Sequence, residues 1–235
     1  MQFFNVFNRK EKLLLAALSI VQFNHIVDFM ILMPLGPTLM RFFSITPEQF
    51  SNLVSAYTFS AGISGILIST IIDRFDRKHA LLFFFSGFAI STIFCGMAKS
   101  YEALLFARLL AGFFGGVIAS LAIAIASDAI GPERRATALG TLATSFSIAS
   151  IFGVPLSLLL ATQYNWHTPF FFLGFLSLFV WVFIWFIIPN MKGHLQNQRN
   201  ESFWTPFKNL FIDSRQLNTA LFNVCLIMSA FTLIP

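Results

Sequence analysis

The stretch "IIDRFDRKHALLFFF", residues 71–85, places five charged side chains within the six positions from Asp73 to Lys78. Long apolar stretches flank these charges on both sides. Of the 235 residues, 57% are hydrophobic and 11% are charged, whereas about a quarter of the residues in a soluble domain are charged. Phe alone occurs 32 times. A soluble chain of this length could not bury so much apolar surface, so the sequence predicts a membrane protein.

The apolar stretches are long enough to span a bilayer, because a membrane helix needs about 20 mostly apolar residues. Six spans fit at residues 13–36, 50–72, 79–98, 102–126, 136–161 and 167–188, and a seventh begins near Leu217. The first run follows three cations but is too long for a signal-peptide core, so we interpret it as an uncleaved span. We predict an all-α integral membrane protein: a six-helix bundle over 1–188, a polar cytoplasmic linker loop over 189–216, and a truncated seventh helix over 217–235.

Lys and Arg are distributed unevenly between the two sets of connectors, and cytoplasmic loops carry the excess. One set holds only Arg41 and Lys99. The other set holds twelve cations: Arg9, Lys10, Lys12, Arg74, Arg77, Lys78, Arg134, Arg135, Lys192, Arg199, Lys208 and Arg215. We therefore expect a multi-pass protein of the plasma membrane, the inner membrane in a bacterium, with a cytoplasmic N-terminus and an even number of crossings before residue 189.

The composition and motifs argue against several other classes of function. The cations lie in short connectors with no basic face that could follow a nucleic-acid backbone, so we expect no nucleic-acid partner. Cys95 and Cys225 both fall in apolar stretches and are interpreted as buried free thiols. No zinc-ligand spacing, nucleotide-binding loop or nucleophile–base pairing is visible, so we expect no metal, no cofactor and no enzyme activity.

The charged turn matches a known pattern, Gly-x-x-x-Asp-Arg-x-Gly-Arg-Lys, which connects the second and third helices of the major facilitator superfamily. This chain has Ser69, Asp73, Arg74, Asp76, Arg77 and Lys78 at the matching positions. Two glycines of the pattern are replaced, by Ser69 and Asp76. The form Asp-Arg-Phe-Asp-Arg-Lys resembles that of drug:proton antiporters in the family.

Three further stretches extend the resemblance over about residues 20–190. "ARLLAGFFGG" carries the arginine of the fourth-helix signature at Arg108, with Ala111 where Gln is often found. "SDAIGPERRATALG" resembles the loop between helices four and five and contains Asp128. "DFMILMPLGP" resembles the first-helix signature of proton-linked exporters. On the fifth helix, Gly153 and Pro155 are separated by Val154, whereas antiporters often carry Gly-Pro directly.

The resemblance implies that the charged turn is a conformational latch. Its members are Asp73, Arg74, Arg77, Lys78 and Asp128. Asp73 can pair with Arg77 four residues on, and in the family this aspartate also faces the positive end of a helix in the second half. The alternative is an ordinary cytoplasmic turn in which an exposed ion pair contributes at most about 1 kcal/mol.

Ionisable residues at membrane depth suggest function because they are costly to bury. At about 100° per residue, Asn24 and His25 lie within about 60° of Asp28 on the first helix, whereas Gln22 is about 120° away and is expected to point elsewhere. If that helix ends near Gly36, Asp28 and Arg108 have similar depths. We predict that Asp28 is the proton carrier and Arg108 its modulator, with Asn24 and His25 as possible contacts for substrate or proton. A fixed Asp28–Arg108 ion pair and the absence of direct contact remain alternatives.

Other features favour packing roles. "GFFGG", residues 112–116, gives a small-residue face that lets helices approach closely. The run Phe170–Phe172 and the stretch "FVWVFIWF" are expected to face lipid. Pro34, Pro37 and Pro155 are expected to bend or end helices, and Gly153 with Pro155 forms the predicted helix-bending pair.

The resemblance implies the N-terminal half of a secondary transporter that works by alternating access, with protons and a small molecule as partners. We expect proton-coupled efflux of small hydrophobic or cationic molecules. A sugar or metabolite exporter of the same fold is the first alternative. The second is an inactive, truncated half-transporter with a structural role, because the sequence ends within an apolar segment. The other expected partners are the lipid bilayer and the missing C-terminal six-helix half.

Overall fold

The computed structural model describes residues 6–72, 74–188, 218–219 and 222, with residues 69–71 described for their backbone only. The chain divides into two compact units, residues 1–195 and 196–235. The predicted linker loop lies outside the described residues, as does the predicted seventh helix apart from Asn218, Thr219 and Phe222.

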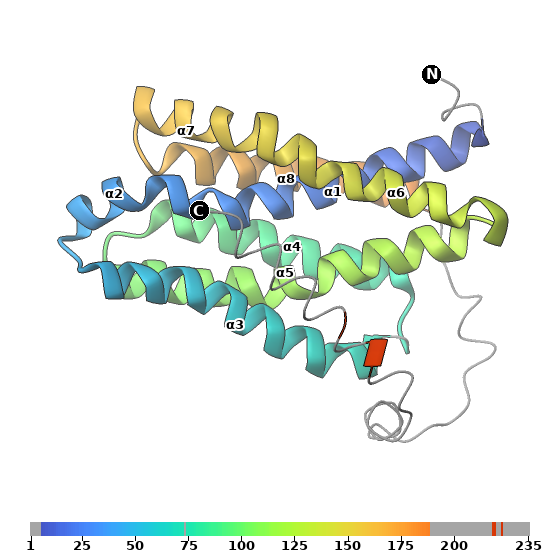
Figure 1. Ribbon diagram of the computed structural model, residues 1–235, viewed down its shortest axis with the longest axis horizontal. Helices are drawn as coiled ribbons and strands as arrows, with labels where there is room; N and C mark the ends of the chain where they lie inside the picture. Colours follow the sequence, from blue (N-terminus) through green and yellow to red (C-terminus); the bar gives the residue numbers. More distant parts are fainter. Residues whose placement is uncertain (1–5, 73, 189–217, 220–221, 223–235) are drawn as a thin grey trace. The chain divides into compact units, whose positions relative to one another are not determined.

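The first unit is a bundle of long helices (Figure 1). They are α1 (Arg9–Met30), α2 (Leu32–Phe43), α3 (Pro47–Ile72), α4 (Arg77–Met97), α5 (Tyr101–Ala129), α6 (Pro132–Ile148), α7 (Val154–Gln163) and α8 (Thr168–Ile187), with a π-helical turn, η2 (Ala149–Gly153), between α6 and α7. Within the described residues, six helical spans are long and apolar enough to cross a membrane. This agrees with the six spans predicted before residue 189.

The first span continues beyond Gly36, where the sequence predicted its end. A break at Ile31 separates α1 from α2, and α2 then runs to Phe43 with Pro37 inside it. Pro34 lacks an N–H and its ring crowds the carbonyl group four residues earlier, at Met30, which explains a bend at this level. The prolines therefore bend the first span without ending it, so the helix end predicted near Gly36 was wrong, although Asp28 and Arg108 do lie at the same level.

Local signals set the starts of several helices. Asn8 caps α1 through a reciprocal capping box with Glu11. Ser100 caps α5. Asp76, which stands where the family pattern has glycine, caps α4: its Oδ1 accepts a hydrogen bond from the Lys78 amide at 2.9 Å. One of the two aspartates in the charged turn thus serves to begin a helix.

Side-chain contacts show that the first and fifth spans run in the same direction and that the sixth begins at the opposite end. At one end of the bundle Arg134, near the start of α6, pairs with Glu11 at the start of α1. At the other end Phe42 of α2 packs against Trp166 and His167, with ring centroids 5.3 and 5.7 Å apart. A large apolar cluster fills each end, one around Phe85 and Phe88 and the other around Leu39.

The aromatic residues divide between the surface and the interior. Phe179 and Phe186 on α8 are exposed, as expected for side chains that face lipid. Phe170 is different: it is fully buried and packs edge-on against Trp166 at 6.2 Å. The prediction that the whole run Phe170–Phe172 faces lipid was therefore wrong for Phe170, because α8 turns that position toward the apolar cluster around Leu39.

Glycines on α5 allow α3 to approach closely. A Cβ on Gly112 would collide with the backbone carbonyl of Tyr57, and one on Gly116 would collide with that of Ala61. Small residues are the usual means by which membrane helices come into backbone contact. The packing role predicted for "GFFGG" is confirmed at these two positions.

We expect Gly116→Ala to lower stability by about 1–3 kcal/mol, because the added methyl group meets backbone atoms that cannot rotate away. Gly62 on α3 is a matched control, since a Cβ there meets nothing within 4 Å. Gly62→Ala should be neutral or stabilising by up to about 1 kcal/mol, the helix propensity difference. Thermal unfolding in detergent measures both variants, and equal midpoints for the two would contradict the close approach of α3 and α5.

Candidate functional site

The site is built around Asp28, near the end of α1, and Arg108, two turns into α5. The Asp28 side chain is fully buried and that of Arg108 is 1% exposed. Arg108 Nη1 donates a hydrogen bond to Asp28 Oδ2 at 3.0 Å, and it also lies 3.3 Å from the Asp28 backbone carbonyl oxygen. The structure therefore shows direct contact between the two charges, and it excludes the alternative in which they do not meet.

Two other helices complete the surroundings of the pair. Thr92 on α4 donates its hydroxyl to Asp28 Oδ1 at 3.2 Å. Tyr57 on α3 places its ring under the guanidinium, with Arg108 Cζ 4.4 Å from the ring centroid, a favourable cation–π arrangement. Both carboxylate oxygens of Asp28 thus accept hydrogen bonds, and the pair connects α1, α4 and α5 while Tyr57 adds α3.

The pair is strongly coupled because neither charge can be buried alone at modest cost. Removing one member of a buried pair typically costs about 3–5 kcal/mol, since the other charge is left uncompensated. Neutralising Asp28 with a proton removes the attraction without removing any atom. The arrangement can therefore exist in two electrostatic states that differ by one proton.

Several polar atoms around the pair lack a hydrogen-bond partner among the described residues. They are both amide atoms of Asn24, His25 Nδ1, the Tyr57 hydroxyl and Arg108 Nε. Buried polar groups in folded proteins are nearly always paired with protein or water. The surroundings of Asp28 thus retain unused hydrogen-bonding capacity that a water molecule or a polar ligand can fill.

Asn24 and His25, the other two residues predicted on the first helix, both lie inside the bundle. Asn24 is fully buried, one turn before Asp28 on α1. The His25 ring packs against Tyr57 and Phe88, with centroids 6.3 and 5.9 Å apart, and a Cβ on Gly115 would touch it. Thr92 and Tyr57 could not be found from the sequence, because single hydroxyl-bearing residues in apolar helices are common and give no signal by themselves.

The charged turn contains an ion pair between helices. Arg77 Nη1 lies 2.6 Å from Asp128 Oδ2 and donates to the Ala124 carbonyl at 2.8 Å, so it joins the start of α4 to the end of α5. Lys78 lies 5.7 Å from the Trp185 ring centroid on α8. Arg74 is exposed. Asp73, with which we expected Arg77 to pair, lies outside the described residues.

Gly153 and Pro155 lie at the π-helical turn that divides the fifth span. The Val154 amide donates to the Ala149 carbonyl, five residues back, and Pro155 has no N–H to give to Ile151. A Cβ on Gly153 would collide with Val27, the residue next to Asp28. The absence of a side chain here lets η2 pack against α1 beside the buried pair.

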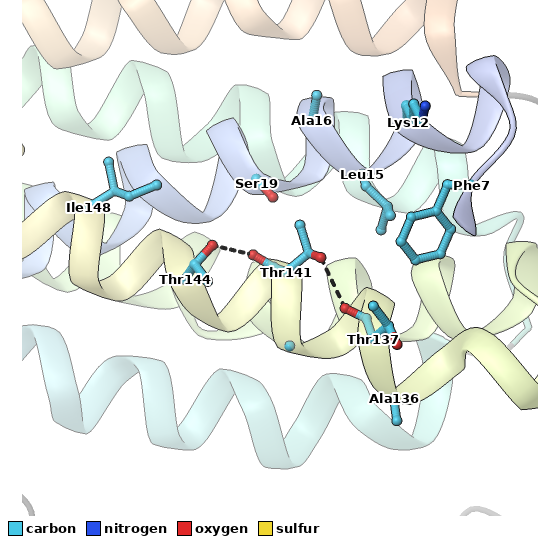
Figure 2. Close-up of a pocket in the computed structure, with 11 residues that line it drawn as sticks. Phe7, Lys12, Leu15, Ala16, Ser19, Ala136, Thr137, Thr141, Thr144 and Ile148 are labelled. Carbon is cyan, nitrogen blue, oxygen red and sulfur yellow. Dashed lines mark hydrogen bonds between the residues drawn. The ribbon is translucent and has the colours of Figure 1, made fainter. Parts of the chain in front are cut away.

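A third ion pair joins the first and fifth spans at one end of the bundle. Arg134 makes a two-pronged contact with Glu11, at 2.7 and 2.9 Å, and donates to the Val6 carbonyl. Between this pair and η2, a groove of about 750 Å³ separates α1 from α6 (Figure 2). Its lining is mostly apolar and includes the hydroxyls of Ser19, Thr137, Thr141 and Thr144, with Lys12 near one end.

No cluster of three or more metal-ligating side chains occurs in the described part of the chain.

The Major Facilitator Superfamily model matches residues 18–235, so the chain belongs to this family. The family assignment confirms that the chain comes from a group of multi-pass membrane transporters and not of enzymes. The six-span bundle agrees with the N-terminal half of the family fold.

Known relatives agree with this assignment. An uncharacterized MFS-type transporter of Bacillus subtilis, YceJ, is 28% identical over 184 residues, which cover 78% of this chain and 47% of YceJ. The multidrug resistance protein fnx1 of Schizosaccharomyces pombe is 30% identical over 167 residues, or 70% of this chain and 31% of fnx1. Other relatives carry names that refer to amino acid uptake or sugar efflux.

Solved structures show the same fold. A bacterial homologue of the human lysosomal transporter Spinster, in an inward-facing and unoccupied conformation, superposes with a TM-score of 0.68 at 18% identity. The match covers 88% of this chain and 50% of that structure. The chain thus spans about half the length of the relatives that it matches, or less.

We expect Arg108→Met to lower stability by about 3–5 kcal/mol, because it leaves the Asp28 carboxylate buried without its charge partner. The double substitution Asp28→Asn with Arg108→Met should recover most of this loss, because no isolated charge remains. Thermal unfolding in detergent, with all variants at one pH, measures the coupling. Additive losses in the double variant would show that the two side chains do not depend on each other.

Proposed function

We propose that the protein is a secondary active transporter that couples proton entry to the efflux of small hydrophobic or cationic molecules by alternating access. The observation that carries this proposal is the buried Asp28–Arg108 pair. Asp28 is the one fully buried carboxylate among the described residues, and it lies on the face of α1 that packs against the fourth span, the span that holds the Arg108 signature of the family.

The chemistry of coupling follows from the two states of Asp28. When the carboxylate is charged, Arg108 and Thr92 hold it, and α1, α4 and α5 are drawn together. When a proton binds, the attraction to Arg108 is lost and the guanidinium keeps its place over Tyr57. A small change in charge therefore alters the relative energies of two helix arrangements, which is what an alternating-access cycle requires.

A fixed ion pair is the structural alternative for Asp28 and Arg108. A carboxylate that served only to hold helices together would be expected to have all nearby polar groups satisfied. Here Asn24, His25 Nδ1, the Tyr57 hydroxyl and Arg108 Nε have no partner among the described residues. This unused capacity supports a site that admits water or a ligand during its cycle.

The substrate class rests on resemblance and on the character of the bundle surface. A relative is named for multidrug resistance, and the groove beside α1 is mostly apolar, which suits hydrophobic molecules. The sugar-efflux name of another relative supports a sugar or metabolite as the second candidate substrate. An inactive half with a structural role is the third possibility, and it predicts no transport under any gradient.

The membrane orientation is part of the proposal. Glu11, Arg77 and Arg134 lie at one end of the bundle, where most of the connector cations of the chain also fall. By the distribution of positive charge this end is cytoplasmic. Efflux then moves substrate from this end of the bundle toward the end that holds Phe42 and Trp166.

We expect Asp28→Asn to abolish acid-driven accumulation of a cationic dye such as ethidium in everted membrane vesicles, since asparagine cannot take up a proton. The control is Glu133→Gln, which removes an exposed acid and should leave accumulation unchanged. Dye accumulation by the Asn variant at the wild-type rate would rule out Asp28 as the carrier. No accumulation by the wild-type protein, with active exchange of labelled sugars, would favour the second substrate class.

The charged turn is proposed to latch one state of the cycle through Arg77, with Asp73, Arg74, Lys78 and Asp128. The Arg77 and Asp128 side chains are 15% and 36% exposed, and Arg77 has a second bond to the Ala124 carbonyl. This partial burial makes the pair stronger than a solvent-exposed one. It remains weak enough to break in each cycle.

We expect Asp128→Asn to slow transport by about fivefold, because a loss of about 1 kcal/mol in one of two states shifts their ratio by that factor. Equilibrium dye binding should change little, since the turn lies away from the buried pair. The exposed Glu102, at the opposite end of the bundle, provides the control variant Glu102→Gln. Parallel losses of binding and transport in Asp128→Asn would indicate misfolding and count against the latch.

A further inference from the structure

Four polar residues follow one another on α1 at intervals of three: Ser19, Gln22, His25 and Asp28. A step of three residues turns the helix by about 300° and rises about 4.5 Å, and side chains three apart are neighbours on the helix surface. The four side chains therefore form one diagonal row, the α1 polar ridge, that winds about halfway around α1. Gln22 lies about 120° from Asp28 around the helix and was therefore expected to point elsewhere, and His25 stands between the two in this row.

Each ridge residue before Asp28 has a buried polar atom without a partner among the described residues. These atoms are Ser19 Oγ, Gln22 Oε1 and His25 Nδ1. Gln22 is only 9% exposed. An unsatisfied buried polar group is costly, so three in one row favour the binding of water between them. A water molecule in a protein interior typically makes two to four hydrogen bonds, which neighbouring ridge side chains can supply.

The ridge begins at the groove between α1 and α6. Ser19 lines this groove and points from α1 toward Thr141 and Thr144 (Figure 2). The two threonine hydroxyls donate to the carbonyls of Thr137 and Thr141 on their own helix. Their oxygen lone pairs remain able to accept hydrogen bonds from water in the groove.

Ser145 on α6 adds a further unpartnered group at the same level. It is 1% exposed, and its hydroxyl has no partner among the described residues. Contacts between Arg134 and Glu11 and between Gly153 and Val27 show that the two helices run in parallel with a nearly constant offset. That offset places Ser145 level with Ser19 and Gln22, where it can hold water between α6 and the ridge.

We propose that Ser19, Gln22 and His25, with Ser145, hold a chain of water molecules that carries protons between the α1–α6 groove and Asp28. The proposal rests on the proposed function of Asp28 as proton carrier and gives that function a route. A hydronium ion in the groove gives up its proton, and one proton arrives on an Asp28 carboxylate oxygen. Each water molecule between them accepts one proton and releases another, so it ends unchanged, while the side chains orient the waters through hydrogen bonds.

The groups that face Asp28 from neighbouring elements are consistent with such a route. Arg108 from α5 holds its charge throughout, and Thr92 from α4 donates a hydrogen bond to the carboxylate. Tyr57 from α3 and Cys95 from α4 also lie within electrostatic range of Asp28. Because α3, α4 and α5 supply these groups, the approach along the ridge is left to His25 and Gln22.

The test compares proton entry from the two sides of the membrane in the complete natural protein that contains this chain. Acid jumps are applied to everted and to right-side-out vesicles loaded with a pH-sensitive dye, in the presence of ethidium. The variants are Gln22→Leu, which removes the amide but keeps most of the volume, and Ser19→Ala. The control is Ser120→Ala, because the exposed Ser120 hydroxyl donates to the Val117 carbonyl on its own helix and lies outside the ridge.

We expect Gln22→Leu to slow proton entry by about tenfold, about the factor that one hydrogen bond contributes, because the variant removes the amide that orients the water molecules. The effect should appear in one vesicle orientation only, with a smaller effect for Ser19→Ala, no effect for Ser120→Ala, and unchanged equilibrium binding of ethidium. Equal slowing in both orientations, or weaker ethidium binding, would overturn the route in favour of a role in packing or in substrate contact.

The same experiment separates the route from the proposed function. If Asp28→Asn stops proton flux while Gln22→Leu and Ser19→Ala leave it unchanged, Asp28 is the carrier and the ridge is not its route. If Asp28→Asn leaves proton flux intact, the proposed function fails and the ridge proposal fails with it. Correct folding of each variant is checked by its thermal midpoint, and Gln22→Met replaces Gln22→Leu if the latter unfolds.

Discussion

The burial of one positive and one negative charge in the membrane interior constrains the rest of the bundle. Asp28 and Arg108 are both almost completely inaccessible, and each is tolerable there only because the other lies 3.0 Å away. While Asp28 is charged, the helices that carry the two residues must therefore keep one register. The other close contacts serve this requirement: glycines on α5 bring α3 near enough for Tyr57 to cover Arg108, and Gly153 lets η2 lie against Val27, beside Asp28.

The two ends of the bundle are held differently from its middle. Each end has a large apolar cluster, whereas the region around the buried pair has polar atoms without partners among the described residues. Apolar packing of this kind resists rearrangement, while a polar region with spare hydrogen-bonding capacity can accept more than one arrangement at similar energy. The middle of the bundle is thus the part best suited to change when charge or ligand changes.

Much of the fold could be predicted from the sequence because bilayer thickness and the distribution of cations act on long segments. The six spans and the small-residue packing of Gly112 and Gly116 followed from such averages. The end of the first span did not, because a proline can either bend or end a helix, and only the packing of α2 decides between them. The burial of Phe170 was missed for a related reason: in a helix that is apolar all round, composition does not say which face meets lipid.

The site was predicted in part. Asp28 and Arg108 stood out because charges are rare at membrane depth, and helical spacing put Asn24 and His25 near Asp28. Thr92, Tyr57 and the Glu11–Arg134 pair could not be found this way, because each depends on contacts between residues far apart in the chain. Gln22 was not predicted as part of the site because it lies about 120° from Asp28 around the helix. Only the position of His25 between them places all three residues in one row.

The π-helical turn at Ala149–Gly153 has a consequence for how this family member can diverge. Such a turn holds one residue more than an α-helix of the same length, with the Val154 amide reaching back to Ala149. Deletion of a single residue here restores regular helix while the residues on either side keep nearly the same faces, because the wide turn takes up its extra residue within one rotation. The fifth span can therefore gain or lose one residue beside Val27 without moving the hydroxyl-bearing stretch that lines the groove.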